Sequence, residues 1–361
     1  MLHCAVNAKI ITLAGFCKKL HAFRNELVGP AKRSWLPRRK PSHFLNRQTG
    51  LPGTMSQIEV FIQYLPLVLY EELTKESATR FLESQEWSLY LYIKRFFSLV
   101  LADRLSEGQV QELEVITLEM LETRIKLTTR LTKPANNSRT KQRKLRKHEF
   151  SWLRPKHVFL LQYASIIRHA GVLKQYSTIR KESKNGELKR MAKVGNNKKN
   201  SLATLLNVEN KLQAATSYDG KFGEEPLTIV ELCLEPDDSV TNYMKGVWED
   251  SSSFTHANRI CYKGIDYSNQ NHQVVLVHIK DKKEFSVGVI RQLLTMSDGE
   301  PTVVFEETDT KLVANLDVYE VTMKGKLGHA KISDLAHYYP RFLYETRNKF
   351  LMTLMCMPYL K

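Results

Sequence analysis

The chain is poor in the features that mark several large classes of protein. Its five cysteines are scattered and no C-x-x-C pair is present, which excludes a disulfide scaffold, a zinc finger and a dithiol redox centre. We interpret the thiols as reduced, in an intracellular protein. The apolar run from Phe61 to Tyr70 has about half the length that a membrane span needs. We therefore expect no membrane partner.

Short catalytic motifs are also missing. No Gly-rich phosphate loop and no G-x-S-x-G elbow occurs, which disfavours a nucleotide kinase, a dehydrogenase and an α/β-hydrolase. The histidines and cysteines of the C-terminal half fit no zinc-binding spacing. The sequence therefore predicts neither a metal site nor a cofactor.

Positive charge is abundant and unevenly distributed. The 361 residues carry a formal net charge of +16, and 42% of them are hydrophobic, as in ordinary globular domains. Residues 1–50 have a net charge of +9 and residues 131–200 of +16, whereas residues 51–130 and 201–361 have −4 and −5. Such asymmetry favours a polyanionic partner, nucleic acid or an anionic membrane surface. The alternative is a solvated linker without a partner.

The first 52 residues are basic and nearly free of acids. We interpret them as a poorly ordered arm whose basic cluster, residues 32–41, contains Arg38, Arg39 and Lys40 as nucleic-acid contacts or a nuclear localisation patch. A mitochondrial transit peptide is disfavoured because Pro37 and Pro41 interrupt an amphipathic helix. A third reading is that the chain begins inside a longer ancestral protein. We expect a nuclear location, with a cytoplasmic one as the alternative.

Residues 53–216 read as a helical domain. Apolar residues at helical spacing predict one helix from about residue 56 with a kink or break at Pro66, and a second from about Lys75 to Asp103. Ser106 and Gln109 have the spacing of a capping box and predict the start of a third helix. Its glutamates lack partner histidines, so we interpret them as a solvated face and not as a metal site: Glu112, Glu114, Glu119 and Glu122.

A basic linker interrupts this domain at residues 133–148. It contains proline, asparagine and serine, followed by a dense run of cations. A block with this composition binds phosphates electrostatically. We therefore predict non-specific binding of nucleic acid, DNA in the first place, by five residues of the linker: Lys141, Arg143, Lys144, Arg146 and Lys147.

The stretch after the linker has a distinctive order of motifs. Residues 150–163 read FSWLRPKHVFLLQY, followed by GVL at 171–173, YSTIRKESK at 176–184 and LKRMA at 188–192. This series resembles a block in large transposon-encoded proteins of animals, which reads approximately L-x-P-K-H-H-F-L-x-H-Y, G-P-L, M-R-F-E-A-K-H and F-K-R. Upstream, residues 53–57 (GTMSQ), 65–67 (LPL) and 87–102 match the same proteins. The resemblance covers about residues 50–216.

This resemblance implies a transposase-like protein of the RNase H type, in which Glu182 would be the third catalytic acid. Lys181 stands where an aromatic residue is usual, and Asn185 where a histidine is usual. A two-metal site needs two more carboxylates, yet Asp103 is the sole aspartate before Glu182. We therefore interpret Glu182 as vestigial, a surface charge that pairs with Arg180 or Lys184, and expect no enzymatic activity.

Residues 225–361 read as a β-rich domain. Alternating or β-branched runs predict strands at 227–235, 273–280, 285–290, 302–306 and 316–322. Strands at this spacing indicate a small antiparallel barrel or sandwich, whose aromatic residues we assign to its core and rim and not to a binding face. The segment from Arg341 to Leu354 predicts a final helix.

Together these patterns predict an α+β protein with segregated domains. Our first hypothesis is a transposon-derived, catalytically incomplete transposase-like protein with basic surfaces that contact nucleic acid. The alternative is a non-enzymatic interaction module, in which a helical scaffold supports a β domain that binds a protein partner.

Overall fold

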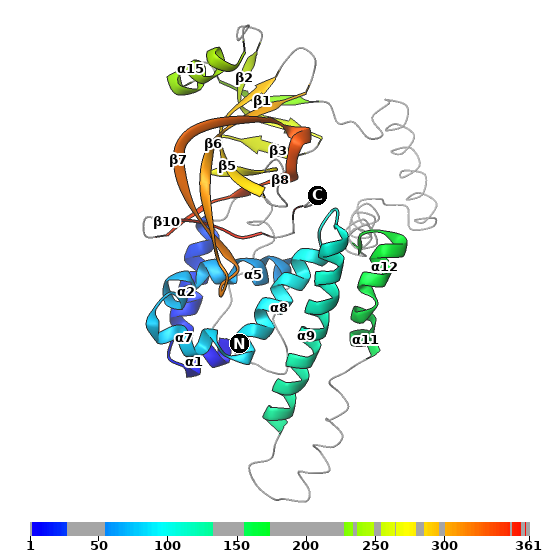
Figure 1. Cartoon of the computed structure of the whole chain (residues 1–361). Coiled ribbons are helices and arrows are strands. Elements are labelled where there is room, and N and C mark those ends of the chain that lie inside the picture. Colours follow the sequence, from blue (N-terminus) through cyan, green and yellow to red (C-terminus); the bar gives the residue numbers. More distant parts are fainter. Residues whose placement is uncertain are drawn as a thin grey trace, which may run out of the picture.

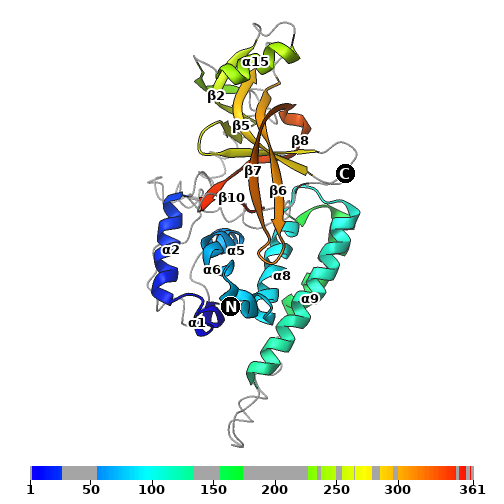
Figure 2. The same ribbon diagram turned by 60° about the vertical axis from the view of Figure 1, so that its left-hand side comes forward.

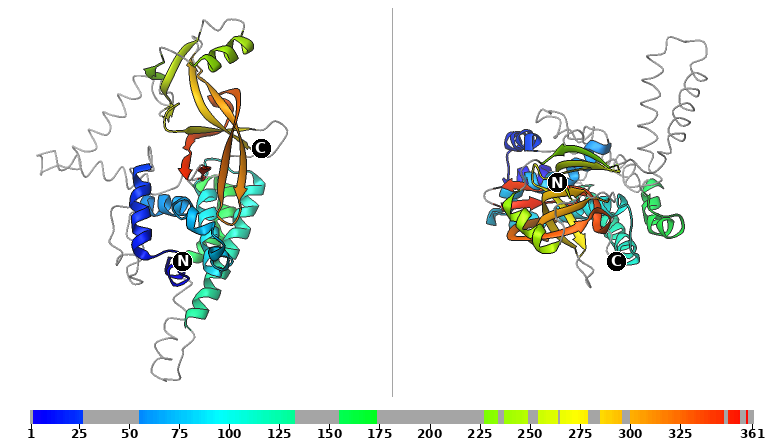
Figure 3. Two further views of the ribbon diagram at one scale, coloured as in Figure 1. Left: turned by 90° about the vertical axis from the view of Figure 1, so that its left-hand side faces the viewer. Right: turned by 90° about the horizontal axis from the view of Figure 1, so that it is seen from above.

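In a computed structural model, the chain folds into a helical half and a curled antiparallel sheet. The structure describes residues 2–26, 55–132, 155–173, 227–233, 237–248, 254–263, 265–278, 285–295, 300–346, 349–354 and 358. Figure 1 shows the sheet above the helices, and the side view in Figure 3 shows the same two layers. The α+β class with segregated halves is therefore confirmed.

The helical half contains these helices in chain order: α1 (Leu2–Asn7), α2 (Leu13–Glu26), α5 (Met55–Val68), α6 (Tyr70–Leu73), η1 (Glu76–Ala78), α7 (Thr79–Leu82), α8 (Gln85–Val100), α9 (Glu107–Thr132), α11 (Pro155–Leu161) and α12 (Tyr163–Ala170). Helices α5 and α8 lie under the sheet, α9 runs along α8, and α11 and α12 pack on α9 (Figures 1 and 2).

Two helix boundaries have a clear local cause. The backbone amide of Ser106 donates to Gln109 Oε1 over 2.9 Å, so the predicted capping box starts α9. The helix predicted from Lys75 to Asp103 is wrong in extent: it is divided into η1, α7 and α8. Ser84 has extended backbone and its Oγ accepts from the amide of Trp87, which makes it the N-cap of a new helix.

Pro66 does not end the first predicted helix, because α5 continues to Val68. Proline has no amide hydrogen, so the carbonyl of Ile62, one turn earlier, loses its helical donor. The hydroxyl of Tyr90 on α8 donates to that carbonyl oxygen over 2.5 Å. A side chain of a neighbouring helix thus replaces the missing backbone hydrogen bond.

The N-terminal segment differs from our expectation. Residues 2–26, assigned to a poorly ordered arm, form α1 and α2, and that part of the prediction was wrong. Phe16, Leu20 and Phe23 repeat along one face of α2 and are buried. Phe16 meets Phe61 of α5 edge to face at 6.4 Å, and the ring of Phe23 lies tilted against that of Tyr344 at 5.2 Å. The residues in these contacts are far apart in the sequence, so local sequence patterns did not reveal them.

The sheet is antiparallel throughout and curls into a half-barrel. It comprises β1 (Thr228–Leu232), β2 (Thr255–Tyr262), β3 (Ile265–Ser268), β4 (Gln273–His278), β5 (Phe285–Thr295), β6 (Thr302–Val313), β7 (Val318–Lys331), β8 (Leu335–Phe342), β9 (Tyr344–Thr346) and β10 (Lys349–Met352). The strand order is β1-β2-β5-β6-β7-β10-β9, with β3 on β2 and β4 between β5 and β8. Helix α15 (Asp238–Val247) and the short η4 (Ile332–Asp334) complete this half.

The predicted helix from Arg341 to Leu354 was wrong, because this segment ends β8 and forms β9 and β10. Strand β10 pairs with β7 and with β9. Pairing with β7, a strand remote in sequence, decides the conformation here. All five predicted strands exist, although β5, β6 and β7 are longer than predicted.

Two glycines make room for one aromatic ring inside the sheet. Phe305 is buried on β6, between Gly288 of β5 and Gly328 of β7. A Cβ atom at Gly288 would lie 2.3 Å from Phe305 Cδ2, closer than atoms can approach. Together with the buried Tyr267, Phe305 lies in the core of the half-barrel, as the sequence predicted for its aromatic residues.

Candidate functional site

The two halves meet where the long β6–β7 hairpin reaches the helices. Residues 314–317 form its tip, and Leu316 is fully buried in the helical core. Asp317 has a φ of +51°, a left-handed conformation that aspartate tolerates better than most residues. Figure 2 shows the hairpin descending to α5 and α8. The turn thereby places a carboxylate against the middle of α8.

A buried ion pair forms at this contact. Lys94 Nζ lies 2.6 Å from Asp317 Oδ2 and also donates to the backbone carbonyl of Asp317. Only 1% of the Lys94 side chain is exposed, against 28% for Asp317. Burial lowers the pKa of Lys94, while the neighbouring carboxylate partly opposes that effect.

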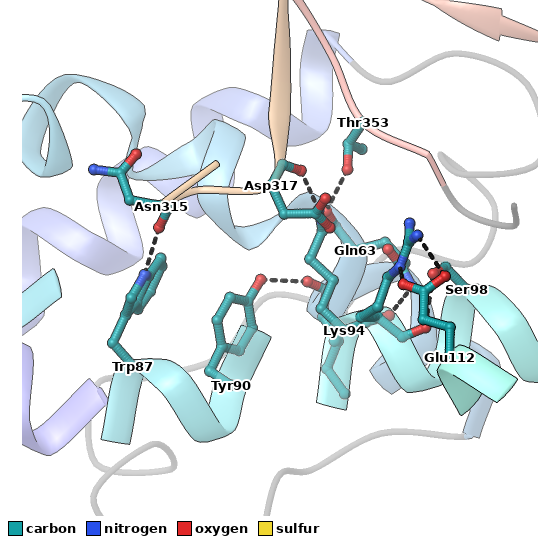
Figure 4. A network of polar contacts seen from close by, with 11 residues as sticks. Gln63, Trp87, Tyr90, Lys94, Ser98, Glu112, Asn315, Asp317 and Thr353 are labelled. Carbon is teal, nitrogen blue, oxygen red and sulfur yellow. Dashed lines mark hydrogen bonds and ion pairs between the residues drawn. The ribbon is translucent and has the colours of Figure 1, made fainter. Parts of the chain in front are cut away.

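Further hydrogen bonds surround the pair (Figure 4). Trp87 Nε1 donates to the carbonyl of Asn315 over 2.7 Å, so a second residue of the tip is held by α8. The side-chain amide Nε2 of Gln63 on α5 donates to the backbone carbonyl of Lys94 over 3.2 Å. Thr353 Oγ1, just after β10, donates to the carbonyl of Gln63 over 3.2 Å. We name this network the hairpin junction; with Lys94 closed from solvent, it can hold two layers together but presents no reactive group.

A second polar cluster lies where the end of α8 meets β8. The backbone amide of Tyr339 donates to His337 Nδ1 over 3.1 Å. His337 Nε2 lies 3.7 Å from Asp103 Oδ2 and 3.5 Å from Arg341 Nη2. Asp103, the sole aspartate before Glu182 in the sequence, thus has the imidazole of His337 as a neighbour.

The acidic residues of α9 are only in part a solvated face. Glu112 pairs with Arg95 of α8 over 2.6 Å, and Glu114 pairs with Arg168 of α12 over 2.6 Å. Glu119 and Glu122 are exposed, as predicted. Among the described residues no group of three His, Cys, Asp or Glu side chains could hold a metal ion. Likewise, no helix within the described ranges is long and apolar enough to cross a membrane.

All nine candidate residues from the sequence fall outside the described residues. Arg38, Arg39 and Lys40 belong to residues 27–54, the five linker cations belong to residues 133–154, and Glu182 belongs to residues 174–226. The structure therefore neither brings these residues together nor separates them, and they stay predictions.

Charge divides unevenly between the described residues and the rest of the sequence. The described residues contain 24 of the 54 Lys and Arg and 25 of the 38 Asp and Glu, so the described fold is nearly neutral. The remaining residues have 30 basic and 13 acidic side chains, and therefore carry the whole positive excess. Three segments, 27–54, 133–154 and 174–226, contain most of it.

Comparison with known proteins adds no functional assignment. No model of a known protein family matches the chain. A search of curated proteins also gives no match.

Sequence reasoning missed both polar clusters described above. The ion pair joins residues 223 positions apart, and the histidine and aspartate of the second cluster come from different halves. One signal was present: Lys94 sits inside a helix that is apolar on several sides, where a charge needs a partner. The identity of that partner depends on the tertiary fold.

Proposed function

We propose that this chain is a non-catalytic nucleic-acid-binding protein, derived from a transposase-like ancestor and acting in the nucleus. The observation that supports it best is the distribution of charge along the sequence: the described residues are nearly neutral, and the positive excess belongs to residues outside the described ranges. Dense runs of lysine and arginine bind phosphates electrostatically. The resemblance over residues 50–216 provides the evolutionary part of the proposal.

The binding part can be tested by titrating salt. Each phosphate contact releases counterions and contributes a slope of about −0.9 to a plot of log affinity against log salt for duplex DNA. Replacing five linker residues with glutamine should flatten the slope by up to about 4.5 and weaken binding: Lys141, Arg143, Lys144, Arg146 and Lys147. Fluorescence anisotropy with a labelled duplex measures both quantities.

The matched control removes the same charge from the fold itself. It replaces five exposed lysines of the described elements and loops with glutamine: Lys126, Lys245, Lys263, Lys311 and Lys331. We expect the slope of this variant to stay close to that of the wild type. Equal slopes for the two variants would show that net charge, and not the linker, drives binding.

The non-catalytic part has its own test. As the single carboxylate of a metal site, Glu182 would hold Mg²⁺ too weakly for strand transfer. Arg180, Lys181 and Lys184 also add positive charge near it in the sequence. We expect no nicking of supercoiled plasmid in the presence of Mg²⁺ or Mn²⁺. Nicking that disappears in the Glu182→Gln variant would contradict the proposal.

A second candidate function, a protein-interaction module, is favoured by a different observation. Twelve large apolar side chains are exposed in the described part of the chain, and nine of them belong to four elements. Six lie on α9, α11 and α12, and three lie on β1 at the edge of the sheet. Neighbouring exposed apolar side chains, such as the three on β1, mark protein contacts.

A further inference from the structure

Helices α11 and α12 are attached to α9 by two polar contacts of different chemistry. Toward the start of α9, Arg168 of α12 reaches Glu107 over 2.8 Å and Glu114 over 2.6 Å. Toward its end, Nη1 of Arg124 lies 3.1 Å from Nε2 of His157 on α11. Figure 1 shows α12 above α11 on the same flank of α9. The first contact joins unlike charges, whereas the second places a cation against a side chain that titrates near neutral pH.

The second contact requires a neutral histidine. A guanidinium group only donates hydrogen bonds, so Nε2 of His157 accepts the bond from Arg124. His157 is 8% exposed, and the helices around it contribute Met120, Leu121 and Ala164 to one apolar cluster. The imidazole therefore takes part in a buried contact in its uncharged form.

A second proton on this ring would remove the contact. Nε2 of His157 would become a donor that faces another donor, and two positive charges would lie across the same 3.1 Å. Burial also removes most of the water that would hydrate an imidazolium. Repulsion and lost hydration both raise the free energy of the docked state relative to a state in which α11 has left α9.

The other charged groups on these helices do not become more negative in acid. On α9, Glu122 pairs with Lys126 over 3.4 Å. On α12, Arg168 is engaged by the two glutamates at the start of α9, and Nδ1 of His169 lies 2.7 Å from the carbonyl oxygen of Ser165. Acidification therefore only adds positive charge around this end of α9.

We propose that His157 makes the docking of α11 on α9 sensitive to acid. At neutral pH the uncharged ring accepts from Arg124 and holds α11 in place. The released helix binds one more proton than the docked one, so docking weakens as pH falls below about 6.5, the pKa of histidine in model peptides. Helix α12 keeps its contact in this range, because the hydrogen bond from Arg168 lowers the pKa of Glu114.

The place of α11 in the chain gives this contact a regulatory use. Helix α11 begins at Pro155, a few residues after the predicted basic linker at 133–148, and α9 ends just before that linker. The docking of α11 thus sets how far apart the two ends of the connecting segment can lie. The contact itself lies between described helices and does not depend on nucleic-acid binding.

Hydrogen exchange of the full chain, followed by mass spectrometry, tests the proposal. Exchange is measured at about pH 7.5 and about pH 5.5, one unit on either side of the ordinary pKa of histidine, and corrected for the intrinsic effect of pH on exchange. Peptides from α11 should open up to about tenfold more at the lower pH, whereas those from α12 should not.

Three variants identify the group responsible. His157→Gln keeps an acceptor for Arg124 but does not titrate, so its α11 should open equally at both pH values. Arg124→Gln keeps the histidine and removes the like charge, so the acid response should shrink; it also replaces the first variant if that one folds poorly by circular dichroism. His169→Gln, at an exposed histidine of α12, is the matched control and should keep the full response.

The proposal is overturned by a wild-type chain in which α11 opens relative to α12 to the same extent at both pH values. A full acid response in His157→Gln would also overturn it, because another group would then be titrating. The same holds for a full response in Arg124→Gln, which would exclude the contact with the guanidinium as the cause. A protein that shows the acid response but does not bind DNA would contradict only the proposed function.

Discussion

The β6–β7 hairpin and helix α12 are both held against a helix by a cation and carboxylates, but in opposite surroundings. At the hairpin junction the cation is the buried Lys94, and its carboxylate comes from a residue 223 positions away. At α12 the cation is Arg168, whose side chain is 33% exposed, and its partners Glu107 and Glu114 are more exposed still. The first contact joins the two halves of the molecule, whereas the second attaches a helix pair to its surface.

This difference teaches how similar pairs acquire different roles. A buried ion pair adds little net stability over apolar residues of the same shape, but it tolerates no loss of one partner. An exposed pair is screened by water and salt, so either partner can be lost at small cost. The junction should therefore fix how the halves are docked, and the α12 contact should only tune how firmly the outer helices lie on α9.

The largest expected effect follows from removing the buried cation. Lys94→Met leaves the Asp317 carboxylate, 28% exposed, against an apolar helix with its main partner gone. We expect the free energy of unfolding to fall by about 3 kcal/mol. Chemical denaturation measures the loss. The double variant with Asp317→Asn, a residue that keeps the left-handed turn, should recover part of it, and no recovery would show that the charge pair is not the cause.

Trp87→Phe should have a smaller effect at the same contact. The indole is fully buried and its Nε1 donates to the carbonyl of Asn315 at the hairpin tip. Phenylalanine cannot donate and is smaller, which corresponds to a loss of about 1–2 kcal/mol. Trp248→Phe, at a half-buried indole near α15, is the control with the same chemical change. Equal losses for both variants would contradict a special role of the tip.

The pH dependence separates Lys94 from an ordinary lysine. In the unfolded chain its amine stays protonated up to about pH 10.4, whereas burial lowers its pKa in the fold. Between the folded and unfolded values the unfolded state binds more protons, so the contribution of this residue to stability rises with pH. The stability difference between wild type and Lys94→Met should therefore widen on going from pH 8 toward about pH 10. A difference that stays constant in pH would show that burial does not perturb this amine.

Local patterns predicted the elements better than their contacts. The capping box at Ser106 and the β-branched runs of β4 to β7 are signals within a few residues. Helix α9 and these strands exist, although β5, β6 and β7 are longer than predicted. The helix α2 and the strands β9 and β10 were misjudged because their conformation depends on partners remote in sequence. Helix α15, within the β-rich half, was not predicted at all.

The residues of the candidate site were harder still to predict from the sequence. Composition identified the basic segments, since a run of cations is visible without any fold. The pairing of Lys94 with Asp317 and of His337 with Asp103 needs the docking of the two halves, which no local pattern encodes. Proline at residue 66 predicted a kink or a break. The hydroxyl of Tyr90 supplies the missing donor, and the helix does not break.

The smallest expected effect is at the exposed ion pairs of Arg168. Arg168→Gln removes the ion pairs with Glu107 and Glu114 but leaves the buried Ala164 and Ile167 of α12 in place. We expect a small fall in stability at low ionic strength that disappears in high salt, because exposed pairs are screened. Thermal unfolding of wild type and variant at two salt concentrations measures it. Lys126→Gln, at an exposed pair within α9, is the control.

The stability of the Arg168→Gln variant at acidic pH tests this contact more specifically. The hydrogen bond from Arg168 lowers the pKa of Glu114 in the fold, so the pair stabilises above the unfolded pKa of about 4.3 and its contribution is lost as pH falls through the folded value. The difference between wild type and Arg168→Gln should therefore shrink below about pH 4. Lys94→Met should show its change at alkaline pH instead. If both variants lost their effect in the same pH range, burial would not be what distinguishes the two contacts.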